Sequence, residues 1–195
     1  MRKKKLLEEP LELELLEKEL KREKHKRKYA LVMKSTVYTL ITVAAVAVLI
    51  ATLWLHVLQI YGSSMTPHLA DGDIVVSTVG KQFKQGDIIA FYYNNKVLIK
   101  RVIAKSGDWV NIAENGDVYV NDVLLDEPYV SEKSIGECDV EMPYQVPEGK
   151  WFVLGDHRSV SVDSRNAAVG CIGTEQVVGK IMFRVWPLKY IGPIE

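Results

Sequence analysis

Two adjacent serines lie in the stretch YGSSMTPHLADGD, which covers residues 61–73. Gly62 and Pro67 flank Ser63 and Ser64, and both residue types favour a sharp, exposed turn. A nucleophilic serine also needs a base within hydrogen-bond reach and donors for the developing oxyanion. By themselves, these residues fit either a surface loop or an active-site turn.

A candidate base is Lys100, in the stretch NKVLIKRVIAKSGD. Because side chains alternate along a strand, we expect Lys100 to share a face with Leu98 and Val102, with Arg101 pointing the other way. An apolar face disfavours the charged amine, so its pKa should fall from about 10.4 to roughly 7–8, where lysine can act as a general base. The alternative is a lysine whose stem packs while its ammonium group reaches water.

The stretch LGDHRSVSVDSR, residues 154–165, concentrates hydroxyl, carboxylate and guanidinium groups. It fits either a plain polar loop or a supporting layer, in which one hydroxyl orients a base and an Asp–Arg pair holds the loop. His157 in this stretch and His68 after the serines keep a Ser–His pair open as well. No metal-ligand spacing is present, and the sequence leaves open whether Cys138 and Cys171 form a disulfide.

An uncharged apolar segment precedes the serines. Val37–Leu58 contains no Asp, Glu, Lys or Arg in 22 residues; as a helix it would span roughly 33 Å, against about 30 Å for a bilayer core. We expect one permanent membrane span, with a buried core helix or a cleaved signal peptide as the alternatives. Residues 1–34 carry 12 basic and 7 acidic residues, whereas residues 35–195 carry 13 and 18. The positive-inside rule then places the N-terminus in the cytoplasm and residues 60–195 outside.

After the serine turn, the sequence consists of short runs rich in Val, Ile, Tyr, Phe and Trp, bounded by Gly-Asp and other turn residues. Such runs are typical of strands, and Asn115–Gly116 predicts a hairpin turn. We predict a mostly β fold with a charged helical head (1–34) and a single transmembrane helix (35–59). An all-β, barrel-like body (60–195) follows, with a small β subdomain or flap at about 106–150.

Three motifs in this order resemble those of the bacterial type I signal peptidases, which are Ser/Lys membrane endopeptidases. They are SSMTP just past the span, KRVIAKSGD, and GDHRSVSVDSR, and the resemblance covers roughly residues 35–190. The lysine at the base position, the short chain and the single span look most like the Gram-positive forms. The resemblance implies cleavage of signal peptides from exported preproteins after small residues, at Ala-x-Ala sites. It implies an acyl-enzyme intermediate and no metal or cofactor.

The resemblance also implies residue roles. Ser64 would be the nucleophile, Lys100 its general base, and the backbone N–H of Ser64 part of the oxyanion hole. Ser63 is a candidate second donor, because Gly62 stands where some members have a serine. His157 replaces a common Asn, and His68 replaces a common Thr. The supporting residues would be Ser161, which orients Lys100, an Asp163–Arg165 ion pair, Asp156 in the same motif, and Met65 beneath the site.

The implied partners are the signal peptides of preproteins, the lipid bilayer and, as a further candidate, the secretion translocon. The net charge of zero gives no case for a nucleic-acid partner. Leu58 and Ser64 are separated by at most about 20 Å of extended chain, so the nucleophile would lie near the outer bilayer surface. Two alternatives are a self-cleaving Ser/Lys autoprotease, against which the membrane span argues, and an inactive membrane-anchored β module that binds partners.

Overall fold

The computed structural model describes residues 2–80 and 82–194, and within residues 2–14 it describes the side chain of Leu13 alone. The chain divides into two compact units, residues 1–53 and 54–195. The first unit is helical, and all strands among the described residues lie in the second unit. Each unit is therefore described by itself.

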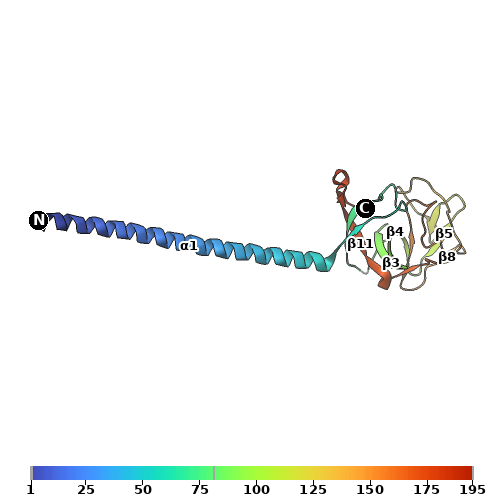
Figure 1. The fold of residues 1–195 in the computed structure, drawn as a ribbon. Helices are drawn as coiled ribbons and strands as arrows, with labels where there is room; N and C mark the ends of the chain where they lie inside the picture. Colours follow the sequence, from blue (N-terminus) through green and yellow to red (C-terminus); the bar gives the residue numbers. More distant parts are fainter. Residues whose placement is uncertain (1, 81, 195) are drawn as a thin grey trace. The chain divides into compact units, whose positions relative to one another are not determined.

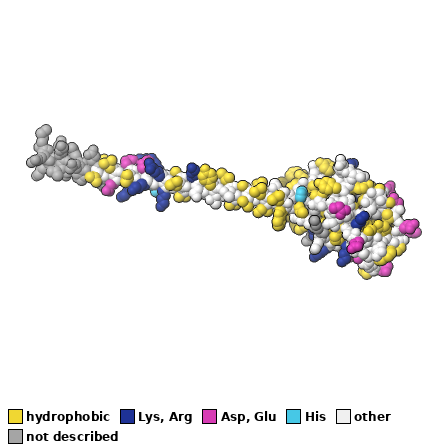
Figure 2. Space-filling model, turned by 90° about the horizontal axis from the view of Figure 1, so that it is seen from below, with side chains coloured by type: hydrophobic (Ala, Val, Ile, Leu, Met, Phe, Trp, Pro, Cys, Tyr) yellow, Lys and Arg dark blue, Asp and Glu magenta, His cyan; other side chains and the backbone are white. Residues whose placement is uncertain are grey.

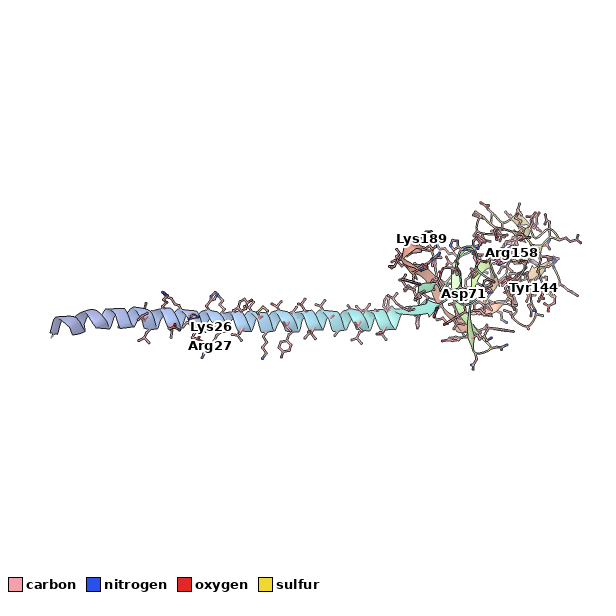
Figure 3. The ribbon with its side chains drawn as sticks, turned by 45° about the horizontal axis from the view of Figure 1, so that its top comes forward. Lys26, Arg27, Asp71, Tyr144, Arg158 and Lys189 are labelled. Carbon is pink, nitrogen blue, oxygen red and sulfur yellow. The ribbon has the colours of Figure 1, made fainter. Side chains whose placement is uncertain are left out.

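Helix α1 runs without interruption over Arg2–Trp54. Leu15–Trp54 is long and apolar enough to cross a membrane, with a mean hydropathy of 2.2 in its most apolar window and none of that window buried. Basic side chains gather on α1 before the apolar stretch (Figure 2), and Lys26 and Arg27 project outward from it (Figure 3). The helix is consistent with a membrane anchor.

The helix ends before the predicted span does. Leu55–Gln59 forms strand β1, which pairs antiparallel with β2, Ile74–Thr78, so that Val57 lies opposite Val76. Strand pairing satisfies the backbone of Leu55 to Leu58, and the apolar composition alone did not reveal this boundary. The uncharged helical part from residue 35 to Trp54 still has a length of about 30 Å, enough for a bilayer core.

A larger and a smaller antiparallel sheet make up the second unit. The larger one has eight strands in the order β1-β2-β11-β3-β4-β9-β10, with β12 paired to β11. Figure 1 shows β3, β4 and β11 side by side. Its further strands are β3 (Ile88–Tyr93), β4 (Lys96–Lys105), β9 (Lys150–Leu154), β10 (Ile172–Gly173), β11 (Val177–Trp186) and β12 (Gly192–Pro193).

The smaller sheet has the order β7-β6-β5-β8. Its hairpin of β5 and β6 closes through Gly116, which has φ of 86° and lies against the backbone of Ser134. Two short 3-10 helices, η1 (Thr174–Gln176) and η2 (Leu188–Tyr190), complete the described elements. The strands of the smaller sheet are β5 (Trp109–Ile112), β6 (Val118–Val120), β7 (Val123–Leu124) and β8 (Tyr144–Gln145).

The predicted class, an all-β body after a single N-terminal helix, is confirmed. Among the described strands, β1 and β10 at the ends of the larger sheet do not pair, so the sheet is open and not a closed barrel. Strand β4 lies inside this sheet, and its residues 99–104 are all buried. A strand buried on both faces can hold a polar side chain away from water, which is the condition that a base with a lowered pKa requires.

Candidate active site

The serine turn connects β1 to β2 and is fastened at both ends. The backbone N–H of Ile60 donates to the carbonyl of Asp73 at 2.8 Å, and that of Gly62 donates to the Asp71 carboxylate at 2.7 Å. Met65 is buried beneath the turn in an apolar cluster of the larger sheet. With Met65 held in the core, the half-buried Ser64 is presented at the surface of the body.

Lys100 reaches Ser64 from the middle of β4. Its Nζ atom lies 2.7 Å from Ser64 Oγ and also donates to the carbonyl of Ile99 at 3.1 Å. The side chain is only 2% exposed. Burial lowers the pKa of Lys100 from 10.5 to about 8, although the nearby carboxylates of Asp163 and Asp156 act in the opposite direction. An amine with this pKa is available in its neutral form near neutral pH.

The strand around Lys100 differs from the simple alternation expected for it. Ile99, Arg101 and Val102 are all buried, so neither face of the strand is open to water at this point. Arg101, on the opposite side, is compensated by a bidentate pair with Asp156, at 2.9 and 2.8 Å. No neighbouring carboxylate makes a salt bridge with Lys100 among the described residues, and this keeps its neutral form accessible.

Ser161 lies close to the main chain of Ser64 and makes no hydrogen bond with Ser64 or Lys100 among the described residues. Its hydroxyl is buried, and among the described residues it has no hydrogen-bond partner. A methyl group built onto Gly155 would overlap this hydroxyl and would also come within 2.5 Å of the carbonyl oxygen of Ser64. Gly155 thus lets Ser161 and the main chain of Ser64 approach each other closely.

Asp163 and Arg165 form a buried ion pair next to these residues. Arg165 Nη2 lies 2.8 Å from Asp163 Oδ2, and the same carboxylate oxygen accepts the backbone N–H of Gly155 at 3.0 Å. Arg165 also donates to the carbonyls of Arg158 and Ile135 at 2.8 and 2.7 Å. The pair therefore holds the Gly155 segment against the loop that follows it.

Two supporting features have no signal in the sequence. Arg158 and Glu127 form a fully buried pair, in which Arg158 Nη1 donates to Glu127 Oε2 at 3.1 Å. The Arg101 guanidinium lies 3.9 Å from the centre of the Tyr129 ring. Glu127 and Tyr129 come from the long connection between β7 and β8, and only the folded chain shows that this connection reaches the site. Figure 3 labels Arg158 within the β-rich unit.

The amide between Ser63 and Ser64 has an unused donor. The Ser63 carbonyl accepts the backbone N–H and the hydroxyl of Thr66, at 3.1 and 2.8 Å. The N–H of Ser64 donates to no protein acceptor among the described residues. This N–H is therefore available to a substrate oxygen, whereas the exposed side chain of Ser63 makes no hydrogen bond in the described part of the protein.

A groove of about 830 Å³ opens beside Ser64 and Lys100. Its walls are residues 57–62 on one side and residues 96–100 of β4 on the other. β9 pairs with β4 only from Arg101 onward, so the backbone of residues 96–100 has a free edge among the described strands. An extended peptide can pair with such an edge. Ser64 and Lys100 are among the residues that line the groove.

The cysteines and histidines of the β-rich unit lie in different surroundings. Cys138 and Cys171 are separate thiols, and Cys171 packs in an apolar cluster with strands of the smaller sheet. No group of three His, Cys, Asp or Glu residues in the described part of the chain is arranged to hold a metal ion. His157 lies near Ser64, with its ring nitrogen Nδ1 at 3.1 Å from Thr66 Oγ1. The carbonyl of His68 accepts from Arg184 at 2.7 Å.

Several known proteins and one protein family have sequences similar to this chain. A family model described as "Signal peptidase, peptidase S26" matches residues 33–186. Signal peptidase IB of Staphylococcus aureus (strain COL) is 38% identical over 150 residues, which are 67% of this chain and 77% of that protein. Thylakoidal processing peptidase 1, chloroplastic, of Arabidopsis thaliana is 34% identical over 163 residues, covering 75% of this chain and 46% of that protein.

This chain thus aligns with about half the length of the plant relative. Among solved structures, the crystal structure of a signal peptidase I from Enterococcus faecalis V583 is 30% identical. It matches 51% of this chain and 96% of that chain, with a TM-score of 0.42.

Proposed function

The chain belongs to the signal peptidases of peptidase family S26, and from this premise we propose that it removes N-terminal signal peptides from preproteins through a Ser64–Lys100 dyad. The observation that carries the proposal is the distance of 2.7 Å between Lys100 Nζ and Ser64 Oγ. The lowered pKa of Lys100, about 8, supports its role as a base. Its neutral amine can accept the hydroxyl proton when the serine attacks.

The proposed reaction has two stages. In the first, Lys100 takes the Ser64 proton while Oγ attacks the carbonyl carbon of the scissile bond, and the backbone N–H of Ser64 donates to the oxyanion. The C–N bond then breaks, Lys100 returns its proton to the leaving amine, and the signal peptide stays on Ser64 as an ester. In the second, Lys100 takes a proton from the attacking water, the ester C–O bond breaks, and that proton goes back to Ser64 Oγ.

The groove supports an extended substrate. We propose that the signal peptide pairs with the free edge of residues 96–100 and passes along residues 57–62, as strand addition requires. Ile60, Met65 and Ile99 are buried apolar residues that line this groove. We propose that they contact small apolar side chains of the substrate, in keeping with cleavage after Ala-x-Ala sites.

The supporting residues hold the groups around the dyad. Asp163 and Arg165 anchor Gly155, and Asp156 compensates Arg101 next to the base. The buried hydroxyl of Ser161 has no hydrogen-bond partner among the described residues. We propose that it accepts a hydrogen bond from Lys100 Nζ during the reaction. Met65 anchors the turn from below, and Ser63 is the candidate second donor to the oxyanion.

The distribution of charged residues along the chain supports one orientation of the chain in the membrane. Basic residues crowd the N-terminal side of the apolar stretch, and the first charge after it is Asp71. We therefore propose a single-pass cell-membrane protein with residues 1–34 in the cytoplasm, 35–59 as the anchoring segment and 60–195 outside, where 106–150 form a subdomain. The bilayer, preprotein signal peptides and, as a candidate, the translocon are the partners in this arrangement.

Preprotein cleavage by the full chain in detergent tests the proposal. Wild type is expected to release the mature protein, while Ser64→Ala and Lys100→Met release none. Lys105→Met, on the exposed end of the same strand, is the matched control and should keep the wild-type rate. Cleavage by either dyad variant, or a serine-directed acylating probe that labels a residue other than Ser64, would refute the assignment. Replacing the alanine before the cut with leucine should slow cleavage, and an unchanged rate would refute the small-residue specificity.

A further inference from the structure

The orientation of the Ser64 N–H depends on contacts made by the opposite end of the same amide group. A trans amide is planar, so its C=O and N–H point in opposite directions. The C=O of Ser63 and the N–H of Ser64 belong to one such amide. Whatever holds the carbonyl of Ser63 therefore also decides where the N–H of Ser64 points.

Thr66 donates two hydrogen bonds to the carbonyl of Ser63. Its backbone N–H and its hydroxyl Oγ1 donate to the Ser63 carbonyl at 3.1 and 2.8 Å. The backbone bond alone would close an ordinary turn. The second donor adds a side-chain bond from the same residue, and this bond can be removed without any change of backbone.

His157 is the second neighbour of the Thr66 hydroxyl. Its Nδ1 lies 3.1 Å from Thr66 Oγ1. A threonine hydroxyl carries a single hydrogen, and the carbonyl of Ser63 can only accept. Both contacts are hydrogen bonds in only one arrangement, in which His157 Nδ1 carries a hydrogen and donates it to Thr66. The bonds then form a chain from the imidazole through the hydroxyl to the carbonyl of Ser63.

The main chain of His157 also contacts the other side of the nucleophile. Its backbone N–H donates to the carbonyl of Ser64 at 3.1 Å. The preceding residue, Asp156, is held by the bidentate pair with the buried Arg101. The peptide groups on both sides of Ser64 are thus tied to one rigid segment, and His157 supplies both connections.

We propose that His157 and Thr66 are positioning residues that orient and polarise the oxyanion donor. Each hydrogen bond in a chain strengthens the next, so donors on the Ser63 carbonyl make the Ser64 N–H a better donor. The stronger Ser64 N–H donor stabilises the oxyanion when it forms in the reaction, and it is not required for substrate binding. This inference rests on the proposed function, in which Ser64 is the nucleophile and its N–H faces the oxyanion.

Steady-state cleavage of a preprotein by Thr66→Val and His157→Phe tests the inference. Each variant removes the side-chain donor and leaves all backbone bonds of the turn. We expect kcat to fall about tenfold in each, the usual value of one such bond, with KM changing less than twofold. Thr66→Ser keeps the hydroxyl and should recover most of the lost rate.

The double variant decides whether the two residues act through one chain of bonds. Both substitutions break the same chain of hydrogen bonds. The kcat of the double variant Thr66→Val with His157→Phe should therefore fall no further than that of the worse single variant. If the two losses in kcat multiply to about a hundredfold in the double variant, the two residues do not act through one chain of hydrogen bonds. Unchanged kcat in both single variants, or a rise in KM alone, would overturn the positioning role.

Two measurements separate this inference from folding defects and from the proposed function. Thermal unfolding of each variant in detergent shows whether a loss of rate follows a loss of structure, and a loss of rate restricted to variants that unfold early counts against the inference. Thr174→Val in η1 provides the matched threonine control. If Ser64→Ala still cleaves, the proposed function itself is wrong; if only the Thr66 and His157 variants are unaffected, the inference alone is wrong.

Discussion

The amine of Lys100 and the hydroxyl of Ser64 lie 2.7 Å apart although the two residues are 36 positions apart in the chain. One group comes from a buried strand and the other from a turn at the surface of the same sheet. The strand removes water from the amine, and the turn keeps the hydroxyl within reach of a substrate. The arrangement therefore places a desolvated amine beside an accessible hydroxyl, which isolated segments of the chain could not provide.

The pH dependence of cleavage should follow the titration of Lys100. Its pKa is lowered to about 8 by burial, and only the neutral amine can accept a proton. We expect kcat/KM to rise with pH, with an apparent pKa of about 8, and to level off above it. The profile is measured on the full chain with a preprotein substrate. A midpoint near 10.5, the ordinary value for lysine, would show that Lys100 is not desolvated.

Replacing Lys100 with methionine should stabilise the fold while it abolishes cleavage. The pKa of Lys100 is about 8 in the folded state and 10.5 ordinarily, so the unfolded chain holds more protons between these pH values. The contribution of this group to the free energy of unfolding therefore increases from pH 8 to 10.5. Below pH 8 the buried amine is charged, and the full cost of burying that charge destabilises the fold. Removing the amine should raise the free energy of unfolding at pH 7 by up to about 3 kcal/mol.

Thermal unfolding in detergent at pH 7 and at pH 10 provides the measurement. The melting temperature of Lys100→Met should exceed that of the wild type at pH 7, and the difference should shrink at pH 10. Lys105→Met serves as the exposed control from the same strand. A lower melting temperature for Lys100→Met at pH 7 would mean that the lysine contributes more through its contacts than it costs through burial.

Gly155→Ala should abolish most activity with little loss of secondary structure. The added methyl group would come within 2.5 Å of the Ser64 carbonyl and would overlap the Ser161 hydroxyl. A shift of about 1 Å at reacting groups can reduce the rate about a hundredfold. Gly192→Ala, where a methyl group would meet nothing within 4 Å, should behave as wild type. Equal cleavage rates for the two variants would show that the Gly155 contact is unimportant.

Asp163→Asn should move the pH profile to lower pH and also weaken the fold. The Asp163 carboxylate raises the pKa of Lys100, whereas Arg165 lowers it, so loss of the carboxylate should lower that pKa further. The buried Arg165 would lose its partner, at a cost of about 3–5 kcal/mol. The profile and the melting temperature are compared with those of Asp126→Asn, an exposed carboxylate. An apparent pKa that stays or rises would contradict the electrostatic argument.

Several features of the protein were predictable from local patterns. An uncharged run of about 20 residues predicts an apolar helix, alternating and β-branched runs predict strands, and Asn115–Gly116 predicts the hairpin that β5 and β6 form. The motifs around Ser64 and Lys100 predicted two side chains that the fold brings to 2.7 Å from each other. These signals were readable because helix, strand and turn preferences depend on residues that are neighbours in the chain.

The tertiary structure decided how these parts meet. Strand β11, from the end of the chain, lies between β2 and β3, and the end of the apolar segment became β1 because β2 offered it a partner. The pair of Glu127 with Arg158 and the contact of Thr66 with His157 join residues 31 and 91 positions apart. Such contacts follow from sheet register and burial, which depend on the whole set of strands, and a single segment does not contain that information.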